Sequence, residues 1–158
     1  MTKLHTSFLA SLLVLLCAGM FSGCITTREP ELTKDEWFTD LPAAQTQAKE
    51  EGKLVLVNFT GSDWCGWCIK LQKDVFSTQE FNAYAKEKLA LVEIDFPNEK
   101  PQPDALKKAN EALQEKYKVE GFPTILVLNG EGAVLWKQVG YMEGGPKAWL
   151  AKLDGLKK

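Results

Sequence analysis

Residues 54–76 read LVLVNFTGSDWCGWCIKLQKDVF and carry two cysteines separated by two residues. The first six of these residues, LVLVNF, form a mostly apolar run with two β-branched valines and without clean alternation, which is typical of a strand covered on both faces. The next four residues, TGSD, provide a turn, and the segment after Cys68 has Leu71 and Val75 at helical spacing. The stretch therefore predicts a strand, a loop, a CxxC motif and a helix, in that order.

Outside this stretch, helical and strand patterns alternate before the chain ends in a hairpin and a helix. A helix capped by Asp40 is expected to stop at Gly52, and the capping-box sequence from Ser77 to Glu80 is expected to open another. The remaining expected elements are strand 89–96, helix 104–117, a hairpin of strands 125–129 and 133–139, and helix 146–156. This order predicts an α/β fold with a central mixed sheet flanked by helices.

The composition suits one globular domain. The chain has 158 residues, 45% of them hydrophobic and 25% charged, with a formal net charge of −2. Its basic residues are scattered rather than clustered, so nucleic-acid binding is not expected. The single histidine, His5, falls in the predicted leader described below, which removes histidine-based catalysis and histidine metal sites from the domain. Most of the chemistry must then come from the cysteines, which are Cys17, Cys24, Cys65 and Cys68.

The N-terminus has the pattern of an export signal. Lys3 precedes the apolar run FLASLLVLLCAGM, which is too short for a bilayer span of about 20 residues but fits the apolar core of a signal peptide. Residues 21–24, FSGC, resemble a bacterial lipobox, although Phe21 stands where leucine is usual. We therefore predict a signal peptide of the lipoprotein type over 1–23, lipidation of Cys24, a flexible tether over 24–35 and the folded domain over 36–158.

A CxxC motif serves as a redox dithiol, as half of a zinc site or as part of a haem attachment site. Ile69 follows Cys68 where a haem motif needs histidine. A tetrahedral zinc site needs four Cys or His ligands, more than the domain supplies, so no metal or cofactor is expected. A structural disulfide across two residues would stabilise the fold only weakly, because such a loop closes little chain entropy. A redox dithiol is favoured, since the motif lies beside a βαβ pattern.

The position of the motif at a helix N-terminus predicts different roles for the two cysteines. Unpaired backbone N–H groups and the helix dipole favour negative charge there, so Cys65 is expected to have a lowered thiol pKa and to be the attacking sulfur. Cys68 lies one turn into the helix and is expected to be less exposed. It would resolve the mixed disulfide that Cys65 makes with a client protein.

The sequence resembles the thioredoxin family over roughly Trp37 to Leu156. The matching features are NFTGSDWCGWCIKLQ after a strand, EIDF on the next strand, GFPT about fifty residues beyond the cysteines, and Gly140 after the last strand. The resemblance implies a three-layer thioredoxin-like fold and a cis Phe122–Pro123 bond that faces the CxxC motif. It also implies a client groove in which the Phe122 backbone pairs with an extended client segment and Trp64 borders the groove, beside Gly66 and Trp67.

Two departures from thioredoxin bear on the chemistry. Asn58 occupies about the place where thioredoxin has the buried acid that assists proton transfer to the second cysteine. Leu91 falls near the position where that acid's lysine partner is usual. Asp63 and Glu93 are the candidate replacements, although Asp63 also fits a solvated charge and Glu93 a side chain that faces solvent. The dipeptide Gly66-Trp67 matches neither reducing nor strongly oxidising relatives. Trp67 is expected either to enlarge an apolar client surface or to pack on a neighbouring loop.

These observations lead to a functional hypothesis. The chain is expected to be an exported thiol-disulfide oxidoreductase on the periplasmic face of a bacterial membrane, tethered through Cys24 or otherwise soluble in the periplasm. Reduction or isomerisation of disulfides in envelope proteins is favoured over oxidation, with a membrane thiol donor that resets the dithiol. Two alternatives remain: a Cu(I)-handling module and a redox-inert peptide-binding module. A monomer is expected.

Overall fold

The computed structural model describes residues 37–156. The predicted signal peptide, Cys24 and the predicted tether lie outside these residues, as do residues 36, 157 and 158 of the predicted domain. The elements follow the order α1 (Leu41–Glu51), β1 (Leu54–Thr60), α2 (Gly66–Leu71), η2 (Gln72–Phe76), α3 (Gln79–Lys88), β2 (Leu89–Asp95), α4 (Asp104–Lys116), β3 (Thr124–Leu128), β4 (Val134–Val139) and α5 (Gly145–Asp154).

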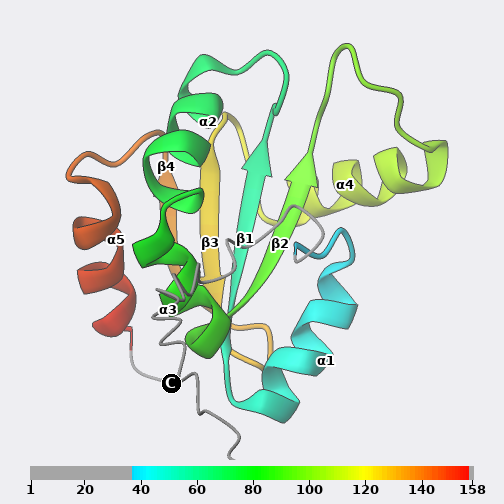
Figure 1. Cartoon of the computed structure of the whole chain (residues 1–158). Coiled ribbons are helices and arrows are strands. Elements are labelled where there is room, and N and C mark those ends of the chain that lie inside the picture. Colours follow the sequence, from blue (N-terminus) through cyan, green and yellow to red (C-terminus); the bar gives the residue numbers. More distant parts are fainter. Residues whose placement is uncertain (1–36, 157–158) are drawn as a thin grey trace, which may run out of the picture.

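The four strands form one mixed sheet, as the sequence predicts, and the structure gives their order as β2-β1-β3-β4. β1 pairs in parallel with β2 and antiparallel with β3, and β3 pairs antiparallel with β4. The parallel pair places the carboxyl ends of β1 and β2 at the same edge of the sheet, where α2 begins (Figure 1). This edge is where a ligand or reactive group is commonly placed in such sheets.

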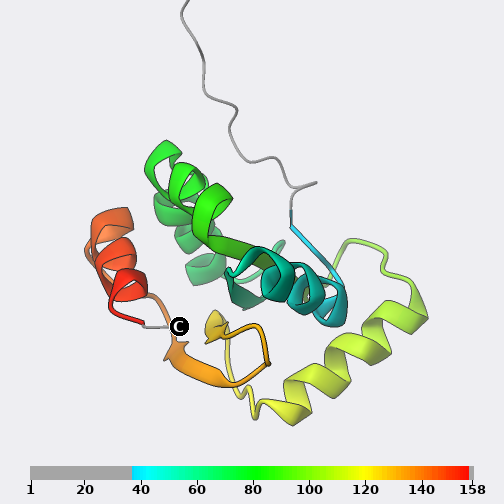
Figure 2. The same cartoon turned by 90° about the horizontal axis from the view of Figure 1, so that it is seen from below.

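Helices cover both faces of the sheet and complete the predicted three layers. One apolar cluster lies beneath α2, η2, α3 and α5, and its largest buried side chains are Phe76, Phe81 and Trp149. The other lies beneath α1 and α4 and includes Val57, Phe59 and Val92. Figure 2 shows α4 on the opposite side of the sheet from α3 and α5. β1 is buried along its whole length, which explains its continuous apolar pattern.

Two local features differ from the expectation. The N-cap of α3 is Thr78 rather than Ser77, because the Thr78 side chain accepts a hydrogen bond from the Phe81 amide while Ser77 ends the preceding helix. That preceding helix is also irregular, since its last turn, η2, is a π-helix. In a π-helix each backbone hydrogen bond spans five residues instead of four. This change does not show in the spacing of apolar residues, because Leu71 and Val75 still have helical spacing.

Candidate active site

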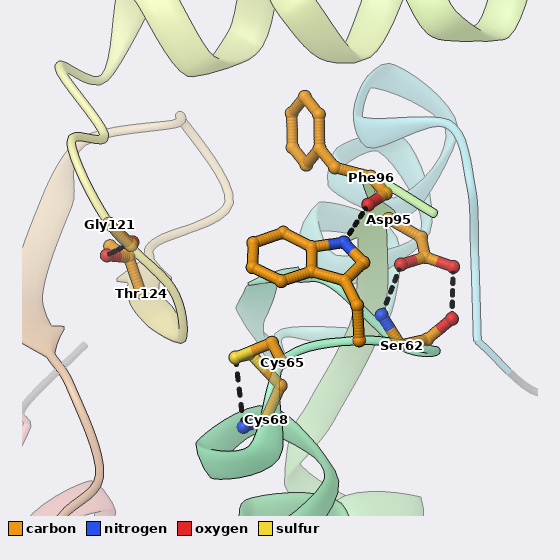
Figure 3. Close-up of a disulfide and its surroundings, with 8 residues drawn as sticks. Ser62, Cys65, Cys68, Asp95, Phe96, Gly121 and Thr124 are labelled. Atoms are coloured by element: carbon orange, nitrogen blue, oxygen red, sulfur yellow. Dashed lines mark hydrogen bonds between the residues drawn. A yellow bond between two sulfur atoms is a disulfide. The ribbon is translucent and has the colours of Figure 1, made fainter. Parts of the chain in front are cut away.

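The CxxC motif lies where β1 passes into α2. Cys65 is the N-cap of α2, in extended backbone conformation, and its Sγ accepts a hydrogen bond from the Cys68 amide at 3.2 Å. The two cysteines form a disulfide (Figure 3). The unpaired N–H groups of a helix N-terminus stabilise a thiolate that lies against them. The local geometry thus supports the attacking role predicted for Cys65.

Both cysteines are nearly buried. Cys65 is 7% exposed and Cys68 is 4% exposed, an order that agrees with the expected roles although the difference is small. Gly66 is the first residue of α2, and a Cβ at that position would meet nothing within 4 Å. The space around Gly66 leaves the face beside Cys65 open for the approach of another chain.

Trp64 lies at the rim of the site and joins two loops. Its indole Nε1 donates a hydrogen bond to the Phe96 carbonyl at 2.7 Å, and its ring packs edge-on against Phe122 at 5.9 Å. Gly61 makes this position possible, since a Cβ there would lie 2.4 Å from the indole ring. Trp64 remains 46% exposed, so one surface of the ring is available at the rim.

The loop that carries Pro123 lies on the other side of the disulfide from Ser62 and Asp95 in Figure 3. The Phe122–Pro123 bond is cis, as the resemblance implies. The ends of this loop are held by hydrogen bonds, because Thr124 Oγ1 donates to the Gly121 carbonyl at 2.7 Å and the Gly140 amide donates to the Pro123 carbonyl at 2.8 Å. Pairing of a client with the Phe122 backbone stays a prediction.

Trp67 packs on a neighbouring loop, as one of the two alternatives expects, and contact with a client stays a prediction. It is 58% exposed, and its ring also contacts the ring of Tyr141 at 5.6 Å. The Tyr141 hydroxyl donates to Asp74 at 2.9 Å, and the Lys70 ammonium group lies over the Tyr141 ring. Trp67 is therefore an apolar surface residue supported from one side by a fixed aromatic ring.

Asp63 has a structural role that the sequence did not reveal. Its carboxylate accepts hydrogen bonds from the backbone amides of Asn98, Glu99 and Lys100 at 2.9 to 3.1 Å. These bonds, foremost that from Asn98, lower the pKa of the Asp63 carboxyl below its usual value. Asp63 is thus neither a merely solvated charge nor a group directed at Cys68. The sequence features that could have indicated this role are an aspartate just before the motif and an Asn-containing loop after the next strand.

A second bridge supports the same loop from β2. The Asp95 carboxylate accepts hydrogen bonds from the Ser62 amide at 2.9 Å and from the Ser62 hydroxyl at 2.6 Å (Figure 3). Two carboxylates therefore fix the segment between β1 and Cys65, one from within the segment and one from the neighbouring strand. The sequence did not predict this bridge, because its members are 33 residues apart.

A cleft of about 520 Å³ with a mixed polar and apolar lining lies beside Cys68, between α2, η2 and the ends of β1 and β2. Cys68 and Glu93 both line it, together with Trp37, Thr60, Ser62, Ile69, Gln72, Lys73, Ser77 and Lys100. Asn58 and Glu93 are directly paired residues of the parallel strands. Glu93 is partly buried and lines this cleft, so it is not simply a solvent-facing residue at the sheet edge.

Comparison with known proteins identifies relatives. A thioredoxin-like domain family matches residues 41–156. The disulfide bond reductase DsbH of Chlamydia pneumoniae is 37% identical over 115 residues, which cover 73% of this chain and 69% of DsbH. The thioredoxin-related protein DsbJ of the same organism is 30% identical over 129 residues, 79% of this chain but 37% of DsbJ. A solved structure of a DsbH oxidoreductase aligns with a TM-score of 0.70 and 32% identity, covering 81% of this chain and 91% of that one.

Proposed function

The chain belongs to the thioredoxin-like family and is a protein disulfide oxidoreductase, and from that premise we propose that it reduces or isomerises disulfides in exported proteins. The observation that carries the proposal is the Cys65–Cys68 pair at the N-terminus of α2, with the Cys68 amide directed at Cys65 Sγ. The name of DsbH, a disulfide bond reductase, supports the reducing direction.

The proposed reaction begins with the reduced dithiol. The Cys65 thiolate attacks a client disulfide and forms a mixed disulfide, and one client sulfur leaves as a thiolate. Cys68 then attacks Cys65 Sγ, releases the second client sulfur and closes the Cys65–Cys68 disulfide. The client gains two electrons and the protein loses two, so an external thiol donor must reduce the pair again.

We also propose that the protein is exported and held at a membrane by a lipid on Cys24. The sequence of residues 1–24 supports this proposal, and those residues lie outside the described structure. No helix within residues 37–156 is long and apolar enough to cross a bilayer. Loss of membrane association in a Cys24→Ala variant, measured by fractionation of cells, is the expected outcome; unchanged association would contradict lipid anchoring at this cysteine.

The reduction potential of the Cys65–Cys68 pair tests the direction. Equilibration of the protein with glutathione buffers should give a potential nearer to that of thioredoxin, about −270 mV, than to that of the strong oxidase DsbA, about −120 mV. A potential near the oxidase value would contradict the reductase proposal. Absence of any reversible couple would favour the redox-inert peptide-binding module.

Trapping of clients tests whether exchange is the function. A Cys68→Ser variant cannot resolve mixed disulfides, so it should accumulate covalent adducts with exported proteins through Cys65, and a Cys65→Ser variant should not. The Cu(I) alternative gives a different result, because reconstitution of the reduced protein with Cu(I) would then load one ion per Cys65–Cys68 pair at high affinity.

A further inference from the structure

We propose that Tyr141 is a positioning residue that holds the ring of Trp67 where an aromatic side chain of the client packs against it. Clients with an aromatic residue next to the cysteine that Cys65 attacks are then preferred. This inference rests on the proposed exchange function and names a class of client for the same site.

Trp67 lies inside the reactive motif and is largely exposed. It is the second residue of α2, between Cys65 and Cys68, and 58% of its surface is exposed. Among the large apolar residues that the structure describes, only Val139 is more exposed. A client whose sulfur approaches Cys65 therefore comes close to the Trp67 ring. Large exposed rings of this kind are common among the residues that dominate binding energy in protein interfaces.

The Trp67 ring rests on Tyr141, which lies in the loop between β4 and α5. The two ring centroids are 5.6 Å apart, and the ring planes are tilted by 35°. Trp64, which precedes the motif, is fixed by the hydrogen bond from its indole to Phe96, whereas Trp67 is supported through its ring. A ring that is already held in one orientation loses less conformational freedom when a client binds, so more of the contact energy is kept.

Three contacts fix Tyr141 in turn. Its hydroxyl donates a hydrogen bond to the Asp74 carboxylate at 2.9 Å, and the Lys70 ammonium group lies 5.0 Å from the centre of its ring. Its ring also packs against the apolar cluster beneath α2 and η2. Lys70 forms an ion pair with Asp74, but such a pair contributes little where both side chains reach solvent. A hydrogen bond to a carboxylate is stronger than one between neutral groups, so the Asp74 bond is the contact to remove in a test.

The π-helical turn η2 carries the Asp74 carboxylate. Asp74 bonds to Lys70 in the preceding helix and to Tyr141, which is 67 residues away in the chain. The next two residues of the turn, Val75 and Phe76, are buried in the core. Turns of this type are frequent at functional sites. We assign η2 to the structure that supports Trp67.

The loop that carries Tyr141 is also bound to the loop that carries Pro123. The Gly140 amide donates a hydrogen bond to the Pro123 carbonyl at 2.8 Å, and Tyr141 follows Gly140 directly. The pair of Trp67 and Tyr141 therefore adjoins both the cysteine motif and the Pro123 loop. A client segment that places its disulfide at Cys65 brings the neighbouring side chain to this pair.

The charges beside the pair favour an aromatic client side chain over a charged one. Aromatic rings attract each other beyond the effect of buried area. A client lysine would also be attracted to a ring, but Lys70 already lies over Tyr141, so a second positive charge would be brought close to the first. A client carboxylate would likewise come close to Asp74. An uncharged ring meets neither repulsion.

The test uses short peptides in which the residue just before or just after a single cysteine is phenylalanine, alanine or lysine. Each cysteine is joined in a disulfide to 2-mercaptoethanol. The reduced full chain, in mild detergent and with Cys17 and Cys24 replaced by serine, reacts in excess over the peptide, and loss of the peptide disulfide is followed by chromatography after acid quenching. The dependence of the rate on protein concentration gives a half-saturating concentration and a maximal rate.

The phenylalanine peptide, in the better of its two positions, should half-saturate at a concentration about 2- to 10-fold lower than the alanine peptide, the range expected for one aromatic pair. The lysine peptide should show no such advantage. Tyr141→Ala should abolish the preference, and Tyr141→Phe, which keeps the ring but loses the Asp74 bond, should reduce it. Maximal rates should change little, and bis(2-hydroxyethyl) disulfide, which has no side chain, should react equally with all variants.

A second measurement separates positioning from a general loss of stability. The heteronuclear NOE of the Trp67 indole N–H, assigned by its absence in Trp67→Phe, reports the order of the ring and should fall in Tyr141→Phe. Tyr84→Phe is the matched control, because it also removes a hydroxyl that is bonded to an aspartate, Asp154, at 3.0 Å. Tyr84→Phe should leave both the NOE and the peptide preference unchanged.

Equal half-saturating concentrations for the phenylalanine and alanine peptides in the wild type would overturn the inference, as would a preference for lysine. So would a Tyr141→Phe variant with the NOE and preference of the wild type, or the same losses in Tyr84→Phe. A wild-type protein that reduces neither the peptides nor bis(2-hydroxyethyl) disulfide would instead contradict the proposed exchange function itself.

Discussion

Asp63 is the single residue on which the loop beside the active site depends most directly. Three backbone amides converge on its carboxylate, and replacement by alanine leaves all three without that acceptor. We expect Asp63→Ala to increase hydrogen exchange at Asn98, Glu99 and Lys100, while Asp63→Asn, which keeps one carbonyl oxygen, gives a smaller increase. Exchange monitored by mass spectrometry checks this. Protection equal to that of the wild type in Asp63→Ala would show that the loop is held elsewhere.

The Asp63 carboxylate should also make the stability of this loop depend on pH. The folded pKa of Asp63 is depressed, so its contribution to stability is present above the unfolded pKa of about 3.9 and is lost as pH falls through the folded value. The amide chemical shifts of residues 98–100, followed by NMR through the acid range, should therefore change together below the unfolded pKa in the wild type. Asp63→Ala should lack this transition. A transition of equal size in both proteins would assign it to another group.

At the scale of helices and strands, α3 is capped by Thr78 and not by Ser77, the cap that the sequence suggests. The Thr78 side chain accepts from the Phe81 amide and donates to the Val75 carbonyl, so it ties α3 to η2. Thr78→Ala should lower the free energy of unfolding by about 1 kcal/mol. Ser77→Ala is the matched control and should change it by less than about 0.5 kcal/mol. Urea unfolding of both variants tests this prediction. A larger loss of unfolding free energy in Ser77→Ala than in Thr78→Ala would contradict the observed cap.

A tyrosine links α3 to α5. The Tyr84 hydroxyl donates to Asp154 at 3.0 Å, and burial, with this hydrogen bond, raises the pKa of Tyr84 to about 12. A raised folded pKa means that the contribution to stability is present below the unfolded value of about 10 and is lost as pH rises toward the folded value. Phenolate absorbance should show a group titrating near pH 12. Tyr84→Phe should lack it, and an unchanged titration curve would refute the assignment.

At the scale of the whole molecule, two tryptophans are expected to differ in role, Trp149 contributing to stability and Trp67 to contact with a client. Trp149 is fully buried against Phe76 and Trp136, whereas Trp67 is 58% exposed beside the cysteines. Trp149→Ala should cost about 3–5 kcal/mol of unfolding free energy, and Trp67→Ala less than about 1 kcal/mol. Trp67→Ala should slow reduction of a protein disulfide more than that of a small disulfide. Equal effects on the two substrates would remove Trp67 from the client surface.

Much of this architecture could be predicted from particular residues. The apolar run before the motif becomes the buried strand β1, Asp40 caps α1 as expected, and the loop from Asn129 to Gly132 joins β3 and β4. The cis bond before Pro123 followed from the resemblance and not from local preference, because most X-Pro bonds are trans. The cap of α3 was wrong by one residue, since Ser77 and Thr78 are both good caps and only the course of η2 selects between them.

The sequence by itself determined the mixed sheet, the dithiol and its place at a helix N-terminus, because apolar spacing, turn residues and the two-residue interval between the cysteines are local properties of the chain. Only the tertiary structure decided what surrounds the dithiol. The bonds of Asp63 and Asp95, the contacts of Trp64 and the cleft that Glu93 shares with Cys68 join segments tens of residues apart. Their partners depend on strand register and loop path, which arise from packing of the whole domain.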